Sequence, residues 1–213
     1  IMGNIITDLE KRALDAYLVT PVKRYKIIFS YYVSSIIVTF FFTAIMWGIT
    51  IVYLGLISGY WFPISVILIT LAILVFFTFI SASLMIYLVT LIKSVNAFGA
   101  LSGILGTLIG FMCGIYMPLV IFTDTVQHVA STIPFTHMTI LLKNILLKEP
   151  MELLTASLGS DEAMSALKPY FGMNEIGLWG INIDMISMMI ASALIAALLL
   201  YLGFRNMSKK IKH

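Results

Sequence analysis

Side chains that could act as catalysts or hold a metal ion are few in this chain, and they lie far apart. His128 and His137 are nine residues apart, a spacing that does not bring two imidazoles to one face of a helix. Asp184 stands beside Asn182 at the edge of an apolar run, so we expect a hydrated helix end rather than a proton relay. The single cysteine, Cys113, lies within an apolar run and is predicted to pack between helices. Because the sequence also lacks a Ser/His/Asp set and a nucleotide-binding glycine loop, it predicts no enzyme, no metal site and no cofactor bound by this chain.

The composition assigns the chain to a membrane. Hydrophobic residues make up 61% of it and charged residues only 11%, against about 25% charged residues in an ordinary soluble domain. A soluble fold could not hide so much apolar surface, because much of any folded surface faces water. The formal net charge of +3 is too small to indicate a nucleic-acid partner. The sequence therefore predicts an all-α membrane protein with the lipid bilayer as its main surroundings.

Charge-free stretches divide this protein into four predicted transmembrane spans. No charged residue occurs between Lys26 and Lys93, or between Lys93 and Asp124. A spanning helix needs about 20 apolar residues, and a cluster of glycine, serine and proline near the middle of the first stretch predicts a hairpin turn. The predicted spans are 27–56, 63–92, 97–121 and 182–204.

Basic residues gather on one side of this predicted topology. Ten of the 13 Lys and Arg residues fall in segment 1–26, at Lys93 or in the basic tail 205–213, and three fall in segment 122–181. Short loops rich in Lys and Arg stay on the cytoplasmic side of a membrane. We therefore expect a multi-pass protein of the cell membrane with both ends cytoplasmic and segment 122–181 external.

The external segment is predicted to contain short helices of its own. Asp124 is a candidate N-cap for a helix over 125–132, and Ser160 followed by Asp161 indicates the start of another. Pro134 can open a helix between them, since proline is tolerated in a first turn. This middle helix would lie in the outer leaflet or re-enter it. Its apolar stripe comprises Met138, Leu141, Leu142, Ile145 and Leu146, with Lys143 and Lys148 off the stripe.

The segment before the first span has the pattern of a short amphipathic helix. It begins at Thr7 as a candidate N-cap, runs to Leu18, and ends at the pair Thr20-Pro21. One interpretation is an interfacial anchor whose basic residues contact lipid headgroups. The other is a docking element for a partner protein, whose charges would set its register.

Three motifs in this sequence resemble those of ABC transporter permeases of the type-2 exporter family. The run Glu10–Arg24, EKRALDAYLVTPVKR, is similar to the family's cytoplasmic loop before the third of six spans. Gly114–Pro118, GIYMP, is similar to the family's Gly-x-x-x-Pro at the outer end of the fifth span. Ile133–His137, IPFTH, is similar to its Asn-Pro-Leu/Thr-Tyr/His segment, with Ile133 in place of the usual Asn. The order and spacing of the three motifs fit over residues 10–148.

This resemblance implies the carboxy-terminal part of a six-span permease whose first two spans precede Ile1. It also implies that the amino-terminal helix is a coupling helix, which contacts a separate ABC ATPase subunit. ATP and Mg²⁺ would be bound by that partner, and a second permease subunit would complete a dimer. The residues expected to contact the ATPase are Asp8, Glu10, Lys11, Arg12, Leu14, Asp15, Tyr17 and Leu18.

Small residues recur at helical spacing along the third predicted span. Such residues let two helix backbones approach closely in lipid. The contact could lie within the same subunit, or it could line the dimer or the transport pathway. Pro118 is predicted to break this helix near the outer surface. The predicted packing residues are Gly99, Ser102, Gly103, Gly106, Gly110 and Gly114.

Together these features predict the membrane subunit of an ATP-driven exporter that hydrolyses nothing itself. The uncharged interior of the spans suits an amphipathic or apolar cargo, such as a drug, a lipid-linked glycan or a peptide. The alternative is a secondary transporter or channel-like protein without an ATPase partner, which would predict a charge or a broken helix at the midplane. An intramembrane enzyme is disfavoured by the lack of paired reactive groups.

Overall fold

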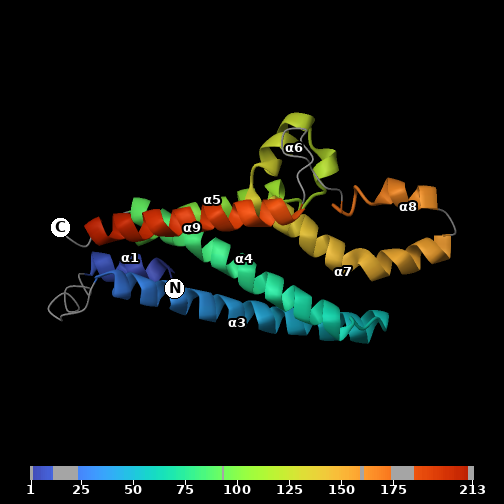
Figure 1. Ribbon diagram of the computed structural model, residues 1–213, viewed down its shortest axis with the longest axis horizontal. Coiled ribbons are helices and arrows are strands. Elements are labelled where there is room, and N and C mark those ends of the chain that lie inside the picture. The colour runs from blue at the N-terminus through green and yellow to red at the C-terminus, as the bar shows by residue number, and fades with distance from the viewer. Residues whose placement is uncertain (1, 12–23, 93, 159–160, 174–184, 211–213) are drawn as a thin grey trace. The chain divides into compact units, whose positions relative to one another are not determined.

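The computed structural model describes residues 2–11, 24–92, 94–158, 161–173 and 185–210. The regular elements of these residues are all helical, as the composition predicts, and no strand occurs among them. The α-helices are α1 (Met2–Glu10), α3 (Arg24–Ser58), α4 (Ile64–Leu91), α5 (Val95–Met112), α6 (Asp124–Ser131), α7 (Pro134–Leu158), α8 (Asp161–Leu167) and α9 (Met185–Lys210) (Figure 1). A 3₁₀-helix, η1, covers Leu119–Ile121.

Four of these helices are long and apolar enough to cross a membrane. They cover Tyr25–Ser58, Ile64–Leu91, Val95–Met112 and Ile186–Met207, so the predicted number of spans is confirmed. Only 6% to 17% of the residues in the most apolar window of each span are buried within the chain. Most of the spanning surface is therefore left for lipid or for another subunit.

The third span is shorter than the predicted range 97–121, because α5 ends at Met112. Gly114 has a φ of +70°, and the N–H groups of Ile115 and Tyr116 both donate to the Gly110 carbonyl, at 3.1 and 3.2 Å. A left-handed glycine with such bonds is a common way to end a helix. The break predicted at Pro118 therefore occurs earlier, and Pro118 instead precedes η1 as its N-cap residue.

Two further boundaries differ from those predicted. Helix α1 begins at Met2 rather than after a cap at Thr7, and the Thr7 hydroxyl donates to the Gly3 carbonyl at 3.2 Å from inside the helix. Such back-bonding is the usual arrangement for a threonine within a helix. At the other end of the chain, α9 runs through to Lys210, so most of the tail predicted for 205–213 continues the last span as helix.

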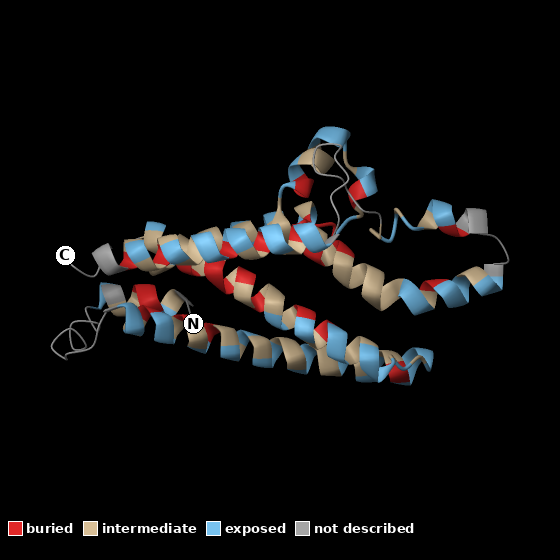
Figure 2. Ribbon diagram, in the orientation of Figure 1, coloured by how far each residue is buried: buried red, intermediate tan, exposed pale blue. Residues whose placement is uncertain are grey.

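The chain divides into two compact units. Unit 1 comprises Ile1–Phe62, Leu74–Ile104 and Ala193–His213, and unit 2 comprises Pro63–Ile73 and Leu105–Ser192. The core of unit 1 joins α1, α3, α4 and the later part of α9, and the buried positions on these helices are red in Figure 2. Its buried residues are Ile5, Ile6, Ile28, Tyr32, Ala82, Ile86, Val89 and Met207.

A polar contact and a close helix approach accompany this core. The Tyr32 hydroxyl on α3 and the Ser83 hydroxyl on α4 are 2.9 Å apart. On α9, a Cβ added to Gly203 would lie 3.1 Å from the Ile86 side chain. In a membrane, close packing and interhelical hydrogen bonds of this kind hold spans together where the hydrophobic effect cannot.

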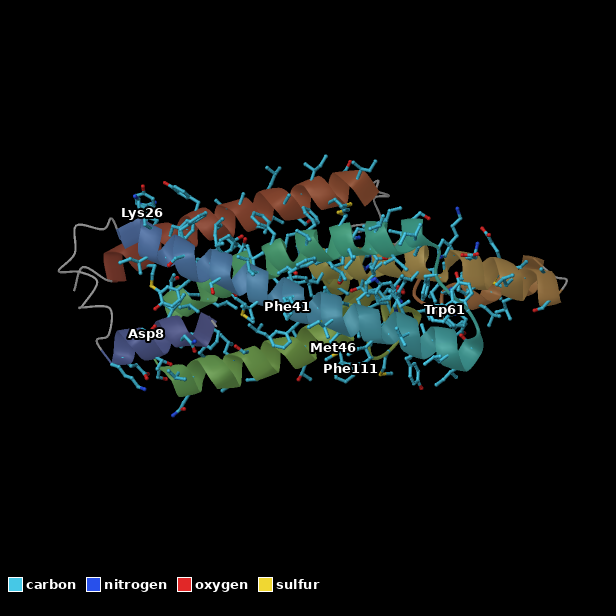
Figure 3. All side chains as sticks on the ribbon, turned by 90° about the horizontal axis from the view of Figure 1, so that it is seen from below. Asp8, Lys26, Phe41, Met46, Trp61 and Phe111 are labelled. Carbon is cyan, nitrogen blue, oxygen red and sulfur yellow. The ribbon has the colours of Figure 1, made fainter. Side chains whose placement is uncertain are left out.

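Aromatic side chains surround the turn between α3 and α4 in unit 1. The Trp61 indole lies against Gly55, where an added Cβ would be 2.7 Å from the ring. The Trp47 and Phe62 ring centroids are 5.5 Å apart. Figure 3 shows Lys26 and Trp61 towards opposite ends of this hairpin, with Phe41 and Met46 along α3 between them. Aromatic residues of this type favour the membrane–water boundary.

Unit 2 contains the short helices predicted for segment 122–181. Helix α7 begins at Pro134 and α8 at Asp161, as the sequence predicts. Thr123 rather than Asp124 is the N-cap residue of α6, and Asp124 lies in the first turn. Helix α7 extends to Leu158 with Pro150 inside it.

Candidate functional site

Helix α1 lies where several helices of unit 1 converge, and it is the first candidate site. Ile5 and Ile6 are 2% and 1% exposed, and they share a core with residues of α3, α4 and α9. Figure 1 shows α1 beside the first turns of α3. Burying an isoleucine side chain contributes about 1.5–3 kcal/mol, so tertiary packing rather than intrinsic helix propensity holds this nine-residue helix in place.

Two carboxylates of α1 bind groups on neighbouring helices. The Tyr31 hydroxyl on α3 donates to an Asp8 carboxylate oxygen, Oδ2. The Val95 backbone N–H, at the start of α5, donates to Glu10 Oε1 at 3.0 Å. Asp8 and Glu10 were both predicted to contact the ATPase, and the structure shows them bound within their own chain.

The other predicted ATPase contacts lie at and beyond the end of α1. Lys11 is exposed and immediately follows the helix. The remaining five residues lie outside the described residues: Arg12, Leu14, Asp15, Tyr17 and Leu18.

The second candidate site is the end of α5 in unit 2, where two of the sequence motifs meet. Thr136, which is fully buried, donates through Oγ1 to the Met112 carbonyl at 3.4 Å and lies 3.6 Å from Cys113 Sγ. Lys143 Nζ donates to the Gly114 carbonyl at 2.7 Å. Residues of α7 therefore satisfy carbonyls that the end of α5 leaves without a helical partner.

Lys143 lies between two left-handed glycines. Besides the bond to Gly114, its ammonium approaches Gly172, where an added Cβ would be 2.8 Å from Nζ. Gly172 has a φ of +68°. Burial of Lys143 lowers the pKa of its ammonium below the ordinary value of 10.5, because a charged group loses hydration in this environment.

The predicted glycine contacts divide into two groups. A Cβ added to Gly99, Gly103 or Gly106 would meet no heavy atom within 4 Å among the described residues. Gly110 instead lies under the Tyr116 ring, and an added Cβ at Gly114 would be 3.0 Å from the Leu119 side chain. Gly110 and Gly114 thus leave room for side chains that follow α5, Tyr116 and Leu119, rather than for a second helix. Ser102 is half-buried.

His137 and Cys113 have contacts of a structural kind. His137 Nε2 lies 2.7 Å from the Ser131 carbonyl. Burial raises the pKa of the Cys113 thiol, which favours the unreactive protonated form. Within the described ranges there is no group of three or more His, Cys, Asp or Glu residues that could hold a metal ion. Asp184 lies outside those ranges.

Sequence reasoning did not identify Tyr31 or Val95 as parts of these sites, and it named Thr136 only as a member of the motif Ile133–His137. Their partners are distant in the sequence, up to 85 residues away for Val95 and Glu10. Lys143 carried a different signal in the sequence, as a charged residue beside an apolar stripe.

Comparison of the sequence with known protein families gives a match over most of the chain. Residues 1–205 match the family described as ABC-2 family transporter protein. The chain belongs to this family. No curated protein and no solved structure gives a significant match to this chain.

As an ABC-2 permease, this chain is a membrane-spanning transport subunit whose matched region contains no ATPase domain. The permease has a cavity of about 440 Å³ between α7 and α8 in unit 2. Its lining combines apolar and charged side chains: Met151, Met164, Met173, Lys148, Glu152 and Lys168. Such a lining is chemically suited to an amphipathic molecule.

The lowered pKa of Lys143 predicts a pH-dependent stability of the permease. Between the folded and unfolded pKa values, the unfolded chain binds more protons, so the free energy of unfolding rises with pH. We expect the midpoint of thermal unfolding in detergent to rise as the pH approaches 10.5, relative to a Lys143→Met variant measured at each pH. Lys148→Met, at an exposed position of the same helix, is the control and should follow wild type. Parallel pH profiles for wild type and Lys143→Met would contradict the prediction.

Proposed function

We propose that this ABC-2 permease is the membrane subunit of an ATP-driven exporter, coupled to a separate ABC ATPase through segment 7–24. The observation that best supports the proposal is the position of α1. It directly precedes the proposed docking residues and is buried against α3, α4 and α9 in unit 1. A rigid helix with these contacts can pass a movement of the docked ATPase on to several spans together.

The charges of the segment favour docking on a protein over simple anchoring in lipid. Lipid headgroups attract basic residues, whereas segment 7–24 carries three acidic residues beside four basic ones: Asp8, Glu10, Asp15, Lys11, Arg12, Lys23 and Arg24. With Asp8 and Glu10 engaged within the chain, the proposed contact with the ATPase falls to Lys11 and the residues that follow it. Mixed charges of this kind set the register and specificity of a protein interface.

The proposed topology places both chain ends in the cytoplasm and unit 2's short helices, from Pro134 onward, at the outer leaflet. This topology is supported by the distribution of Lys and Arg: ten lie in the segments proposed to be cytoplasmic, and three lie in segment 122–181. A second permease subunit is proposed to complete the pathway. The low burial of the spans, 6% to 17%, leaves apolar surface for such a partner.

The proposed cargo is amphipathic or apolar. No charged residue lies between Lys26 and Lys93, so the first two spans offer a cargo no ionic partner. The cavity between α7 and α8 adds a place where apolar and charged groups lie together. An ion-coupled transporter would instead be expected to carry ionisable groups inside its spans.

Charge reversal in the docking segment tests the proposal. We expect the permease to co-purify with its ATPase and to change the ATP turnover of that ATPase. The triple variant Lys11→Glu, Arg12→Glu, Asp15→Lys should lose both effects, because like charges would then face each other across the interface. Accumulation of an amphipathic fluorescent dye inside inside-out vesicles on addition of ATP would measure export directly.

A matched triple reversal on α7 is the control for this experiment. Lys148→Glu, Glu149→Lys and Glu152→Lys change three exposed charges in unit 2, and the complex should keep its ATPase bound and active. Because Lys148 and Glu152 line the cavity between α7 and α8, this control is compared by ATPase binding and turnover, not by dye accumulation. If the segment variant kept the ATPase bound and active while the control did likewise, the coupling proposal would be wrong. Dye movement driven by an ion gradient without any ATPase would favour the secondary transporter instead.

A further inference from the structure

Helix α5 receives the cap of its first turn from two parts of the chain. The Ala97 N–H donates to the Ser94 side chain at 3.2 Å, which is an ordinary local cap. The Val95 N–H donates instead to Glu10 Oε1 at 3.0 Å, across 85 residues of sequence. Both donors belong to the first turn, where backbone N–H groups have no partner inside the helix.

A carboxylate suits this position for a second reason. The amino end of a helix carries a partial positive charge, so an anionic side chain there is stabilised. Glu10 is the last residue of α1, and its carboxylate therefore joins the end of one helix directly to the beginning of another. Figure 3 shows α1, marked by Asp8, beside the first turns of α5.

The same short helix is also tied to α3. The Tyr31 hydroxyl donates to Asp8, and Ile5 and Ile6 pack into the core that includes Ile28 and Tyr32 of α3. Near the start of α1, a Cβ on Gly3 would contact the Phe98 ring of α5 at 3.6 Å. Helix α1 is thus attached to α3 along one side and to α5 at Gly3 and Glu10.

From these contacts we infer that Glu10 is a positioning residue, which makes α5 move together with α1 when the ATPase acts on the adjoining segment. This inference rests on the proposed function. The backbone joins the docking segment directly to α3. The backbone path from α3 to α5, in contrast, runs through the whole of α4. The Glu10–Val95 bond is the short connection, so movement of α1 reaches the first and third spans together.

A distance measurement between α1 and α5 tests the inference. Spin labels at Asn4→Cys and Asn96→Cys, both exposed positions, report this distance in a Cys113→Ser background with the ATPase bound. In wild type we expect a narrow distance distribution that is the same without nucleotide and after trapping with ATP, Mg²⁺ and vanadate. Glu10→Ala should broaden the distribution and make its mean change on trapping.

Two variants separate positioning from a general loss of structure. Glu10→Gln keeps an oxygen acceptor for the Val95 N–H and should behave as wild type. Val95→Pro removes the donor at a helix position where proline is tolerated, and it should behave as Glu10→Ala. The inference is overturned if the wild-type distance changes on trapping, or if Glu10→Ala and Val95→Pro both keep the narrow, constant distribution. Failure of the ATPase to bind the wild-type permease would instead refute the proposed function.

Discussion

A Gly114→Val substitution is expected to lower the free energy of unfolding by about 2–6 kcal/mol, as strain of about 1–3 kcal/mol and overpacking of about 1–3 kcal/mol combine. The strain arises because Gly114 has a φ of +70°, which a β-branched residue adopts very rarely. The overpacking arises because the new Cβ would lie 3.0 Å from the Leu119 side chain. The midpoint of thermal unfolding in detergent measures the effect.

Two other glycines allow these contributions to be separated. Gly59 has nearly the same φ, +69°, but an added Cβ there meets nothing within 4 Å. Gly59→Val should therefore lower the free energy of unfolding by the strain contribution alone. Gly106→Val, at an open helical position, should show neither the strain nor the overpacking contribution. Equal losses at Gly114 and Gly59 would mean that Leu119 does not pack as described.

The second large effect is expected at Ile6, which is 1% exposed in the core of unit 1. Ile6→Ala should lower the free energy of unfolding by about 2–5 kcal/mol, the usual range for emptying a buried isoleucine site. Ile6→Asp should be worse, because a carboxylate would be buried without a partner. Amide hydrogen exchange in α1 should accelerate in both variants, since this short helix depends on its packing.

An exposed isoleucine provides the control for this prediction. Ile37 on α3 is 61% exposed within the chain, and Ile37→Ala should change the unfolding free energy by no more than about 0.5 kcal/mol. If Ile6→Ala left both the stability and the exchange of α1 unchanged, α1 would not be part of the core.

The sequence predicted the number of spans because hydropathy and charge are averaged over many residues. It did not predict the end of α5, since Cys113–Ile121 is as uncharged as the helix before it. A single left-handed glycine ends the helix there, and a composition window cannot detect one dihedral angle. The four-residue spacing of Gly106, Gly110 and Gly114 suggested a packing face, whereas the last two glycines accommodate Tyr116 and Leu119.

The contacts of α1 could not have been predicted for a different reason. Asp8 and Glu10 have the pattern of charges on the solvent-facing side of an amphipathic helix. Their actual partners, Tyr31 and Val95, are fixed only when α3 and α5 are in place. Likewise, the prediction that the helix starts at Thr7 left Ile5 and Ile6 outside the helix, although both are core residues.

The long separation between Glu10 and Val95 also bears on how the protein is made. At a synthesis rate of about 5–20 residues per second, Val95 emerges about 4–17 seconds after Glu10. The core around Ile5 and Ile6 further includes Met207, so it cannot close before residue 207 has been translated. Helix α1 is therefore translated well before the last of its core partners, and Ile5 and Ile6 have an incomplete core until α9 is in place.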